Sequence, residues 1–171
     1  MAPPAPSPRL SYREFQAGDL PDLAALLADP MVMRYSWHGP LDEGGSRVVL
    51  AGFQNVYREY GFGKWAVHLR ATGEFVGYCG LEPCPSGAPD GFELGYRLVP
   101  DSWGQGLASE AVDTVVGHAF ATARLPLIYA FLEPVNIASA RVLAKARFRR
   151  INQNVPLNGK AMDIYRLDAP D

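Results

Sequence analysis

Cysteine and histidine are scarce in this sequence, and neither forms a recognisable ligand pattern. The 171 residues include two cysteines and three histidines. Cys79 and Cys84 are too few for a disulfide framework and wrongly spaced for a zinc knuckle or a CxxC redox pair. The histidines are scattered, with no carboxylate or cysteine at ligand spacing beside them. We therefore expect no metal site, and we interpret both cysteines as structural or incidental.

Long apolar runs and an excess of positive charge are also missing. No stretch reaches the roughly 18 apolar residues of a membrane helix, and the opening MAPPAPSP lacks the basic and apolar regions of a signal peptide. The net charge of −2 excludes the broad basic surface typical of a nucleic-acid binder. The sequence thus predicts a cytoplasmic protein with neither membrane nor nucleic-acid partners.

The residues that are present suit one globular domain. Hydrophobic residues make up 48% of the chain and charged residues 20%, which is enough apolar material for a single core at this length. The proline-rich residues 1–8 offer nothing apolar for burial and are expected to form a disordered tail. The domain is expected to span residues 9–168.

Hydrophobic periodicity predicts an α/β (α+β) domain with about seven strands and four helices. Helical spacing predicts helices from residue 20 to a stop at Pro30 and at 42–60, 103–120 and 136–146. Alternation and short apolar runs predict strands at 10–15, 65–69, 75–81, 92–99, 127–132, 148–153 and 161–167. The strands from 65 to 99 suggest an antiparallel meander, whereas the strand, helix and strand from 92 to 132 imply parallel pairing. The sheet is therefore expected to be mixed.

The most informative segment is a strand that runs through a glycine-bearing loop into a long amphipathic helix, over residues 92–111. Such a junction directs backbone N–H groups and the positive end of a helix dipole at one point, where a pyrophosphate can bind. Gly104 and Gly106 matter because a side chain there would hold phosphates away from the backbone. The chain has no GxxxxGK[ST] motif, and the loop lacks the third glycine of GxGxxG.

Trp103 to Ala108 reads WGQGLA and resembles the acetyl-coenzyme A signature of the GNAT superfamily of N-acetyltransferases, Q/R-x-x-G-x-G/A. Trp103 in the first position is common in the branch of ribosomal-protein N-terminal (Rim-type) acetyltransferases, whose E-I/L-G-Y motif is matched by residues 93–96. Residues 136–148 resemble the family's N-x-x-S-x-x-x-x-x-K-x-G-F, with Arg147 in place of the glycine, which affects the turn expected there. The likeness covers residues 9–168.

The resemblance implies the GNAT fold, in which the fourth and fifth strands splay apart and acetyl-CoA lies between them as cosubstrate. It implies contacts to the cofactor from Leu98, Val99, Gly104, Gln105, Gly106, Leu107, Ala108, Asn136 and Ser139. In this set Leu98 and Val99 supply backbone groups to the pantetheine, and Gln105 to Ala108 donate N–H groups to the pyrophosphate. Asn136 and Ser139 are three apart and share a helical face, although Asn136 is also a preferred helix N-cap. Trp103 either flanks the site or packs beneath it.

Transfer requires an amine that has lost its proton, because an ammonium has no lone pair. Glu93 is the candidate general base, since it alternates with Gly95 on one strand face and a strand glycine leaves room for substrate. Glu82 is the reserve, and an ion pair between Glu93 and Arg97 is the structural alternative.

A second group must protonate the departing thiolate. The resemblance places the hydroxyl of Ser139 near the thioester sulfur, so Ser139 is the second catalytic candidate. Tyr96 is either an acid as well or a core aromatic.

We therefore expect an acetyl-CoA-dependent N-acetyltransferase that acts by direct transfer on a protein N-terminal amine or a small-molecule amine. The alternative is a noncatalytic CoA-binding or regulatory module. Acceptor choice is expected to depend on the loops around 31–47 and 153–161, where Met33, Tyr35, Trp37 and His38 either line a pocket or cover the core. A homodimer is an open alternative to a monomer, since dimers are frequent among the resembled enzymes.

Overall fold

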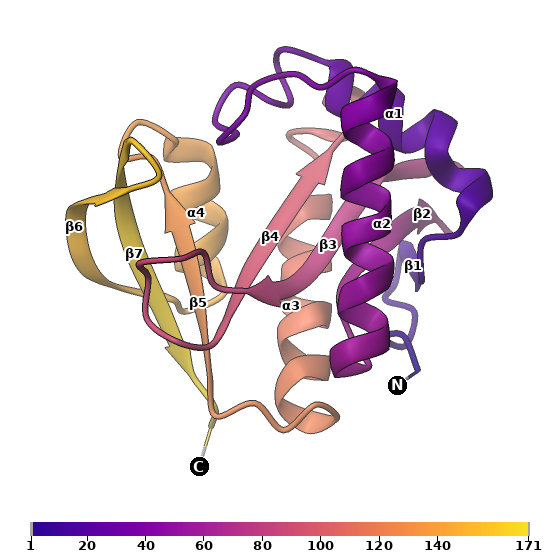
Figure 1. Cartoon of the computed structure of the whole chain (residues 1–171). Helices are drawn as coiled ribbons and strands as arrows, with labels where there is room; N and C mark the ends of the chain where they lie inside the picture. Colours follow the sequence, from indigo (N-terminus) through magenta and orange to yellow (C-terminus); the bar gives the residue numbers. More distant parts are fainter. Residues whose placement is uncertain (1, 171) are drawn as a thin grey trace.

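A single seven-stranded mixed sheet forms the centre of the computed structural model, which describes residues 2–170 (Figure 1). Its strands lie in the order β1-β2-β3-β4-β5-β7-β6. The strands are β1 (Leu10–Arg13), β2 (Lys64–Leu69), β3 (Phe75–Pro83), β4 (Phe92–Leu98), β5 (Leu127–Leu132), β6 (Arg149–Leu157) and β7 (Lys160–Asp168). The helices are α1 (Leu20–Ala28), α2 (Glu43–Tyr60), α3 (Leu107–Ala121) and α4 (Ile137–Lys145). The predicted fold class is confirmed.

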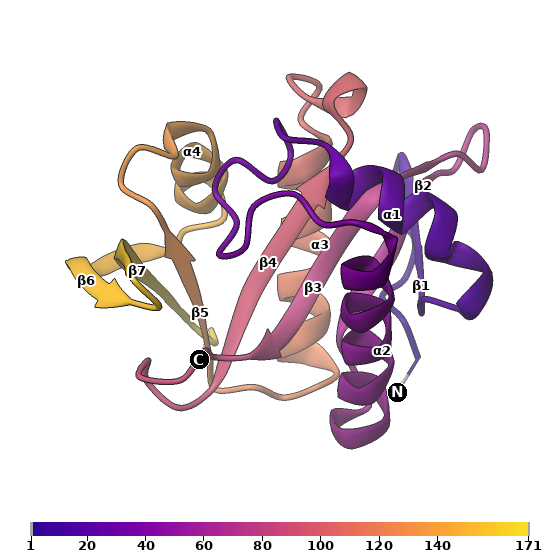
Figure 2. The ribbon, with the colours of Figure 1, turned by 45° about the horizontal axis from the view of Figure 1, so that its top comes forward.

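Within the described residues the sheet has one parallel pair of strands, β4 and β5, and these two strands splay apart. Strands β1 to β4 form an antiparallel meander, whereas β4 and β5 are paired only at Glu93 and Tyr129. On its other side β5 pairs with β7 along its whole length. Both views show β4 and β5 diverging (Figures 1 and 2). The predicted splay between the fourth and fifth strands is therefore confirmed, and it leaves one edge of β4 unpaired.

Helices cover both faces of the sheet. In Figures 1 and 2, α1 and α2 lie on one face and α3 lies on the other, where α4 packs against it. The predicted apolar stripe of α3 is buried at Leu107, Ala111, Val112, Val115 and Ala119. Such a stripe at helical spacing fixes which side of α3 faces the strands, and so where the first turn of α3 points.

The start of α3 differs from the predicted helix over residues 103–120. The helix begins at Leu107, because Gly104 and Gly106 adopt left-handed φ values of 72° and 78°, which interrupt a right-handed helix. A 3₁₀ turn over Pro100–Ser102 precedes them. The four residues before Leu107 therefore form an open loop instead of the first turn of a helix.

A hairpin closes the C-terminal part of the sheet, and the N-terminal segment is hydrogen-bonded to α3. The predicted hairpin turn is confirmed at Asn158 and Gly159, which have φ values of 47° and 79° between β6 and β7. In the predicted tail, the Ser7 hydroxyl donates to Glu110 on α3 at 2.7 Å; Met1 lies outside the described residues. The domain bounds of 9–168 stay a prediction. No helix within residues 2–170 is both long and apolar enough to cross a membrane.

Candidate active site

The gap between β4 and β5 contains a cavity of about 630 Å³. This volume is within the usual range for small-molecule and cofactor sites. Eight of the predicted residues line it: Glu93, Leu98, Gly104, Gly106, Leu107, Ala108, Asn136 and Ser139. Val99 and Gln105 do not. The fold thus brings most of the predicted residues from β4, the glycine loop, α3 and α4 to one place.

The glycine loop presents unbonded amides at the mouth of α3. Among residues 2–170, no hydrogen bond in the structure uses the backbone N–H of residues 104–109. The first bonded amide is that of Glu110, which donates to the Gly106 carbonyl at 3.1 Å. The Arg9 guanidinium donates to the Gln105 carbonyl on the same loop. Free amides at the positive end of a fifteen-residue helix are suited to bind an anion.

The backbone N–H of Val99 is directed away from the gap. Its N–H donates to Val76 on β3 at 2.9 Å, and its carbonyl accepts from Ser102 at 3.0 Å, so both backbone groups are engaged within the chain. Because successive residues of a strand direct their backbone groups to opposite sides, Leu98 and Tyr96 face the gap instead. Tyr96 was missed in this respect, although strand alternation alone would have identified it.

Trp103 partly covers the backbone carbonyl of Leu98. Its indole Nε1 donates to the Leu98 carbonyl at 2.8 Å, while its side chain remains exposed beside the cavity. Trp103 therefore flanks the site and also holds the loop against the end of β4. This leaves the Leu98 N–H and a second lone pair on its carbonyl for a ligand.

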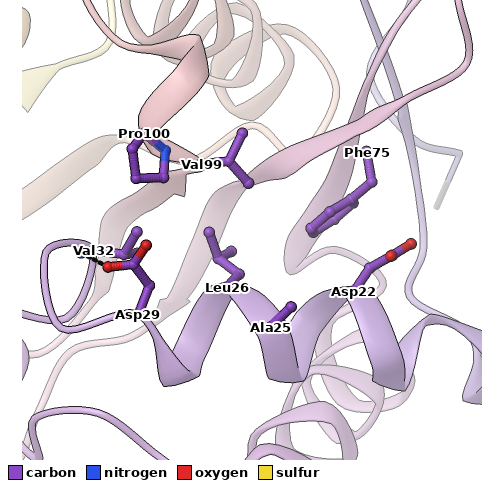
Figure 3. A pocket seen from close by; sticks show the side chains of 8 residues that line it. All are labelled: Asp22, Ala25, Leu26, Asp29, Val32, Phe75, Val99 and Pro100. Carbon is purple, nitrogen blue, oxygen red and sulfur yellow. Dashed lines mark hydrogen bonds between the residues drawn. The ribbon is translucent and has the colours of Figure 1, made fainter.

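Val99 instead lines a separate hollow of about 190 Å³ beneath α1 (Figure 3). Leu26, Val32 and Phe75 supply its apolar walls. Asp29 lies at its rim and accepts from the Val32 amide at 3.4 Å, which binds the loop after α1 to the end of that helix. This hollow belongs to the packing of α1 on the sheet.

On α4, the helix-cap alternative for Asn136 is the one that the structure shows. Its Oδ1 accepts from the Ser139 amide at 3.2 Å, the usual N-cap contact. Ser139 lines the cavity, and its hydroxyl lies near that of Tyr96. Asn136 thus acts on the site mainly by fixing the first turn of α4.

Opposite Ser139 lies the hydroxyl of Tyr96, which is buried without a hydrogen-bond partner in the described chain. Burial raises the pKa of Tyr96 to about 12, although the neighbouring Ser139 acts in the opposite direction. An unpaired buried hydroxyl is costly, so this group is suited to bind a ligand atom that enters the gap.

At the other end of the cavity, Glu93 and Glu82 are direct cross-strand partners on β4 and β3. Lys64 on β2 reaches them, with Nζ 2.9 Å from Glu82 Oε1. Burial, opposed by Lys64 and reinforced by Glu82, raises the pKa of Glu93 to about 8. Burial also acts to raise the pKa of Glu82, but Lys64 outweighs it and lowers that pKa below its ordinary value. The two carboxyl groups therefore tend to hold one proton between them.

Two expectations about this cluster are wrong. The space above Gly95 holds the Lys64 ammonium, with which a Cβ at Gly95 would collide, so it is not free for substrate. Arg97 forms no ion pair with Glu93, because its guanidinium donates to the Tyr78 hydroxyl and lies 5.8 Å from the centre of that ring. Lys64 was missed because nothing in its local sequence marks it as buried.

One side of the cavity is formed partly by the segment after α1. Tyr35 and Trp37 line the cavity, as one of the two predicted alternatives has it, whereas Met33 is buried in the core. Cys79 is fully buried, and burial raises the pKa of its thiol to about 12, so it is unsuited to carry an acyl group. Residues 2–170 contain no cluster of three histidine, cysteine or acidic side chains that could hold a metal.

Comparisons with known proteins agree with this geometry. The family model described as an acetyltransferase (GNAT) domain matches residues 9–149. The chain is 27% identical over 161 residues to an uncharacterized N-acetyltransferase, p20, of Bacillus licheniformis, covering 92% of this chain and 90% of that protein.

Solved structures share the fold. An acetyltransferase from Agrobacterium tumefaciens str. C58 has a TM-score of 0.85 and 26% identity, covering 98% of this chain and 95% of that chain. A spermidine N-acetyltransferase from Vibrio cholerae, solved with CoA and spermine, has a TM-score of 0.72 and 16% identity, covering 94% of each chain, and therefore shows the fold alone. Ribosomal-protein acetyltransferases are among the further structures of this fold.

A mixed sheet that separates beside a helix with free amides, together with the family match, defines an acetyltransferase whose acetyl donor is acetyl-CoA. The chain belongs to the GNAT acetyltransferase family. The predicted superfamily and enzyme class are thereby confirmed.

Proposed function

We propose that this enzyme transfers the acetyl group of acetyl-CoA directly to an unprotonated amine, either a protein N-terminal amine or a small-molecule amine. The observation that carries the proposal is the row of unbonded amides at the mouth of α3, which opens on the same cavity as Glu93 and Ser139. One cavity thus offers an anion site for the diphosphate and two ionisable or hydroxylic groups for proton transfer.

The chain's own residues fit the parts of the donor. The amides of Gln105, Gly106, Leu107 and Ala108 would hold the pyrophosphate, and the left-handed backbone of Gly104 and Gly106 exposes them. The backbone of Leu98, and that of Tyr96, would continue the hydrogen bonding of β4 along the pantetheine. The bound donor would replace the missing partner strand at the free edge of β4.

The chemistry then needs two proton movements. The Glu93 carboxylate takes a proton from the ammonium, and the amine nitrogen forms a bond to the acetyl carbon as the carbon–sulfur bond breaks. The Ser139 hydroxyl gives a proton to the departing sulfur and regains one from the new amide nitrogen, so that the products are an amide and a free thiol. The unpaired Tyr96 hydroxyl lies beside Ser139 and would stabilise the charge that develops there.

The acceptor is proposed only by class. The signature that includes Trp103 supports the Rim-type branch and a protein N-terminus, whereas the spermidine enzyme of the same fold is named for a small amine. Both acceptors present a primary amine, which the wide cavity beside Tyr35 and Trp37 would admit. The cytoplasmic location and the dimer stay predictions.

The test is the release of free thiol from acetyl-CoA in the presence of a panel of amines and N-terminal peptides, with mass spectrometry of the product. We expect thiol release with at least one acceptor and an acetylated amine as product. CoA binding in calorimetry without thiol above background for any acceptor would instead identify a noncatalytic binding module.

A further inference from the structure

Lys64 crosses two strands to reach the acidic pair in the cavity. Lys64 on β2 lies opposite Gly80 on β3, and Gly80 lies opposite Gly95 on β4, so the three residues form one row across the sheet. Directly opposed residues share a face. The lysine side chain can therefore lie along this row only if both neighbours lack a side chain.

The two glycines meet that requirement. A Cβ at Gly80 would collide with the backbone of Gly63 and Lys64, and a Cβ at Gly95 would collide with the Lys64 ammonium. Two residues further along β3 and β4, on the same face, stand Glu82 and Glu93. The Lys64 side chain thus lies over the two glycines, and its ammonium contacts the pair of carboxyl groups.

Lys64 is almost fully buried, whereas Glu82 is partly exposed in the cavity. The Lys64 side chain is 3% exposed, whereas that of Glu82 is 38% exposed and lines the cavity with Glu93. Burial opposes the charge on Lys64, but Glu82 and Glu93 outweigh it and raise its pKa above the ordinary value. Lys64 therefore stays charged although it is almost fully buried in the wall of the cavity.

We propose that Lys64 is a positioning residue that, with Glu82, sets the protonation of Glu93 and so sets the pH at which the enzyme deprotonates its amine. This inference rests on the proposed function. A buried positive charge favours the ionised carboxylate and a neighbouring carboxylate disfavours it, so the two partners act on Glu93 in opposite directions.

Other charged and titratable groups act on this cluster or line the same cavity. They are Tyr78 on β3, Cys84 after β3, Arg97 on β4, Tyr129 on β5, Arg34 in the segment after α1, and Arg141 and Lys145 on α4. Of these, Arg97 is bound to the Tyr78 hydroxyl and favours the ionised form of Glu93. None of these groups changes in the variants below, so each variant isolates one charge.

The sign of the pH dependence follows from the role of Glu93. A general base works when it is unprotonated, so kcat should rise with pH through the pKa of Glu93. Lys64→Met removes a positive charge and should move this rise to higher pH. Glu82→Gln removes a negative charge while keeping an oxygen for Lys64, and should move the rise to lower pH. Shifts of about one pH unit or more are expected for charges this close.

The experiment measures kcat against pH at saturating acetyl-CoA and one fixed amine for the wild type, Lys64→Met and Glu82→Gln. Because the amine is the same throughout, its own ionisation does not distinguish the variants. Arg149→Met is the control: it removes one positive charge from the ion pair between Arg149 on β6 and Asp168 on β7, which does not line the cavity, and its profile should coincide with that of the wild type.

A second readout does not depend on turnover. The side-chain carboxyl carbon of Glu93, assigned by its loss in Glu93→Gln, is titrated by ¹³C NMR in the same variants without substrate. Its midpoint should rise in Lys64→Met and fall in Glu82→Gln. Identical midpoints, or shifts of the same sign, would overturn the inference.

The two proposals fail separately. Opposite NMR shifts without acetyl transfer to any amine would support the coupling and refute the proposed function. Acetyl transfer with unmoved NMR midpoints would support the function and refute the coupling. If circular dichroism shows that Lys64→Met does not fold, the comparison of Glu82→Gln with the wild type and Arg149→Met decides the question.

Discussion

Gly106 lies where the loop turns into α3, and its left-handed φ of 78° aims the neighbouring amides outward. Gly106→Val places a branched side chain in a conformation that such residues strongly disfavour. We expect the loop to rearrange and the dissociation constant for CoA to rise roughly a hundredfold or more, since hydrogen bonds to charged groups contribute about 1.5–3 kcal/mol each. Isothermal titration calorimetry measures the change.

Gly117→Ala supplies the control for that substitution. Gly117 lies within the same helix, and a Cβ there meets nothing within 4 Å. Its CoA affinity should equal that of the wild type. Unchanged affinity in Gly106→Val as well would refute the assignment of the loop to the diphosphate.

Ser139 offers a second test at the scale of single residues. Ser139→Ala removes the hydroxyl but keeps the amide that Asn136 caps, so α4 should stay intact. We expect kcat to fall by about a hundredfold, with little change in the dissociation constant for acetyl-CoA. The loss should shrink with an acetyl thioester of a more acidic thiol, which needs less protonation on leaving. A loss of equal size with both thioesters would contradict the role of Ser139 as an acid.

The site residues that sequence reasoning found are those with local signals. Gly104 and Gly106 are marked by the strand, loop and helix around them, and Ser139 by its place in a second motif. Lys64 lies on a different strand from either glutamate, and only the register of three strands brings them together. The direction of the Val99 backbone was also not predictable, because it depends on strand parity, which the motif does not state.

At the scale of elements, the turn after α4 retains the geometry of a glycine without having one. Arg147 has a φ of 67°, the left-handed conformation in which glycine is usual just past a helix end. A residue with a Cβ in this conformation costs roughly 1–2 kcal/mol. Arg147→Gly should therefore raise the free energy of unfolding by about 1 kcal/mol after the greater flexibility of an unfolded glycine is subtracted. Urea denaturation measures it.

A matched arginine checks that reasoning. Arg149 lies in β6, where glycine weakens a strand, so Arg149→Gly should lower the free energy of unfolding. A decrease for Arg147→Gly as well would mean that contacts of the Arg147 side chain outweigh the strain.

The helix predicted over residues 42–60 agrees with α2 to within one residue, and Gly61 ends it as predicted, with a φ of 76°. In the structure Asp42 caps its start by accepting from the Gly45 amide. The start of α3 was placed four residues too early, because its apolar stripe continues smoothly into Trp103 while the two glycines act only through their φ angles. Periodicity reports which side chains are apolar and does not report backbone handedness.

At the scale of the whole molecule, one carboxylate connects the N-terminal segment to the glycine loop. Glu110, in the first turn of α3, accepts from the Ser7 hydroxyl and from the amide and Nε of Arg9, each at 2.7 Å. Arg9 also donates to the Gln105 carbonyl at 2.9 Å. The first strand and the glycine loop are therefore held by the same group, so a change at Glu110 should affect both folding and donor binding.

Glu110→Gln tests this link. Burial acts to raise the pKa of Glu110, but Ser7 and Arg9 outweigh it and hold that pKa below the ordinary 4.5. A carboxylate with a lowered pKa stabilises the fold above about pH 4.5, and this contribution is lost as the pH falls through the folded value.

At pH 7 the variant should lose about 1–2 kcal/mol of unfolding free energy. The loss is no larger because Arg9 is half exposed and its ion pair is screened. The deficit should shrink towards pH 3, and CoA affinity at pH 7 should fall several-fold. Denaturation at both pH values and calorimetry measure these effects; a deficit that is the same at pH 3 and pH 7 would show that the charge on Glu110 does not connect the two parts.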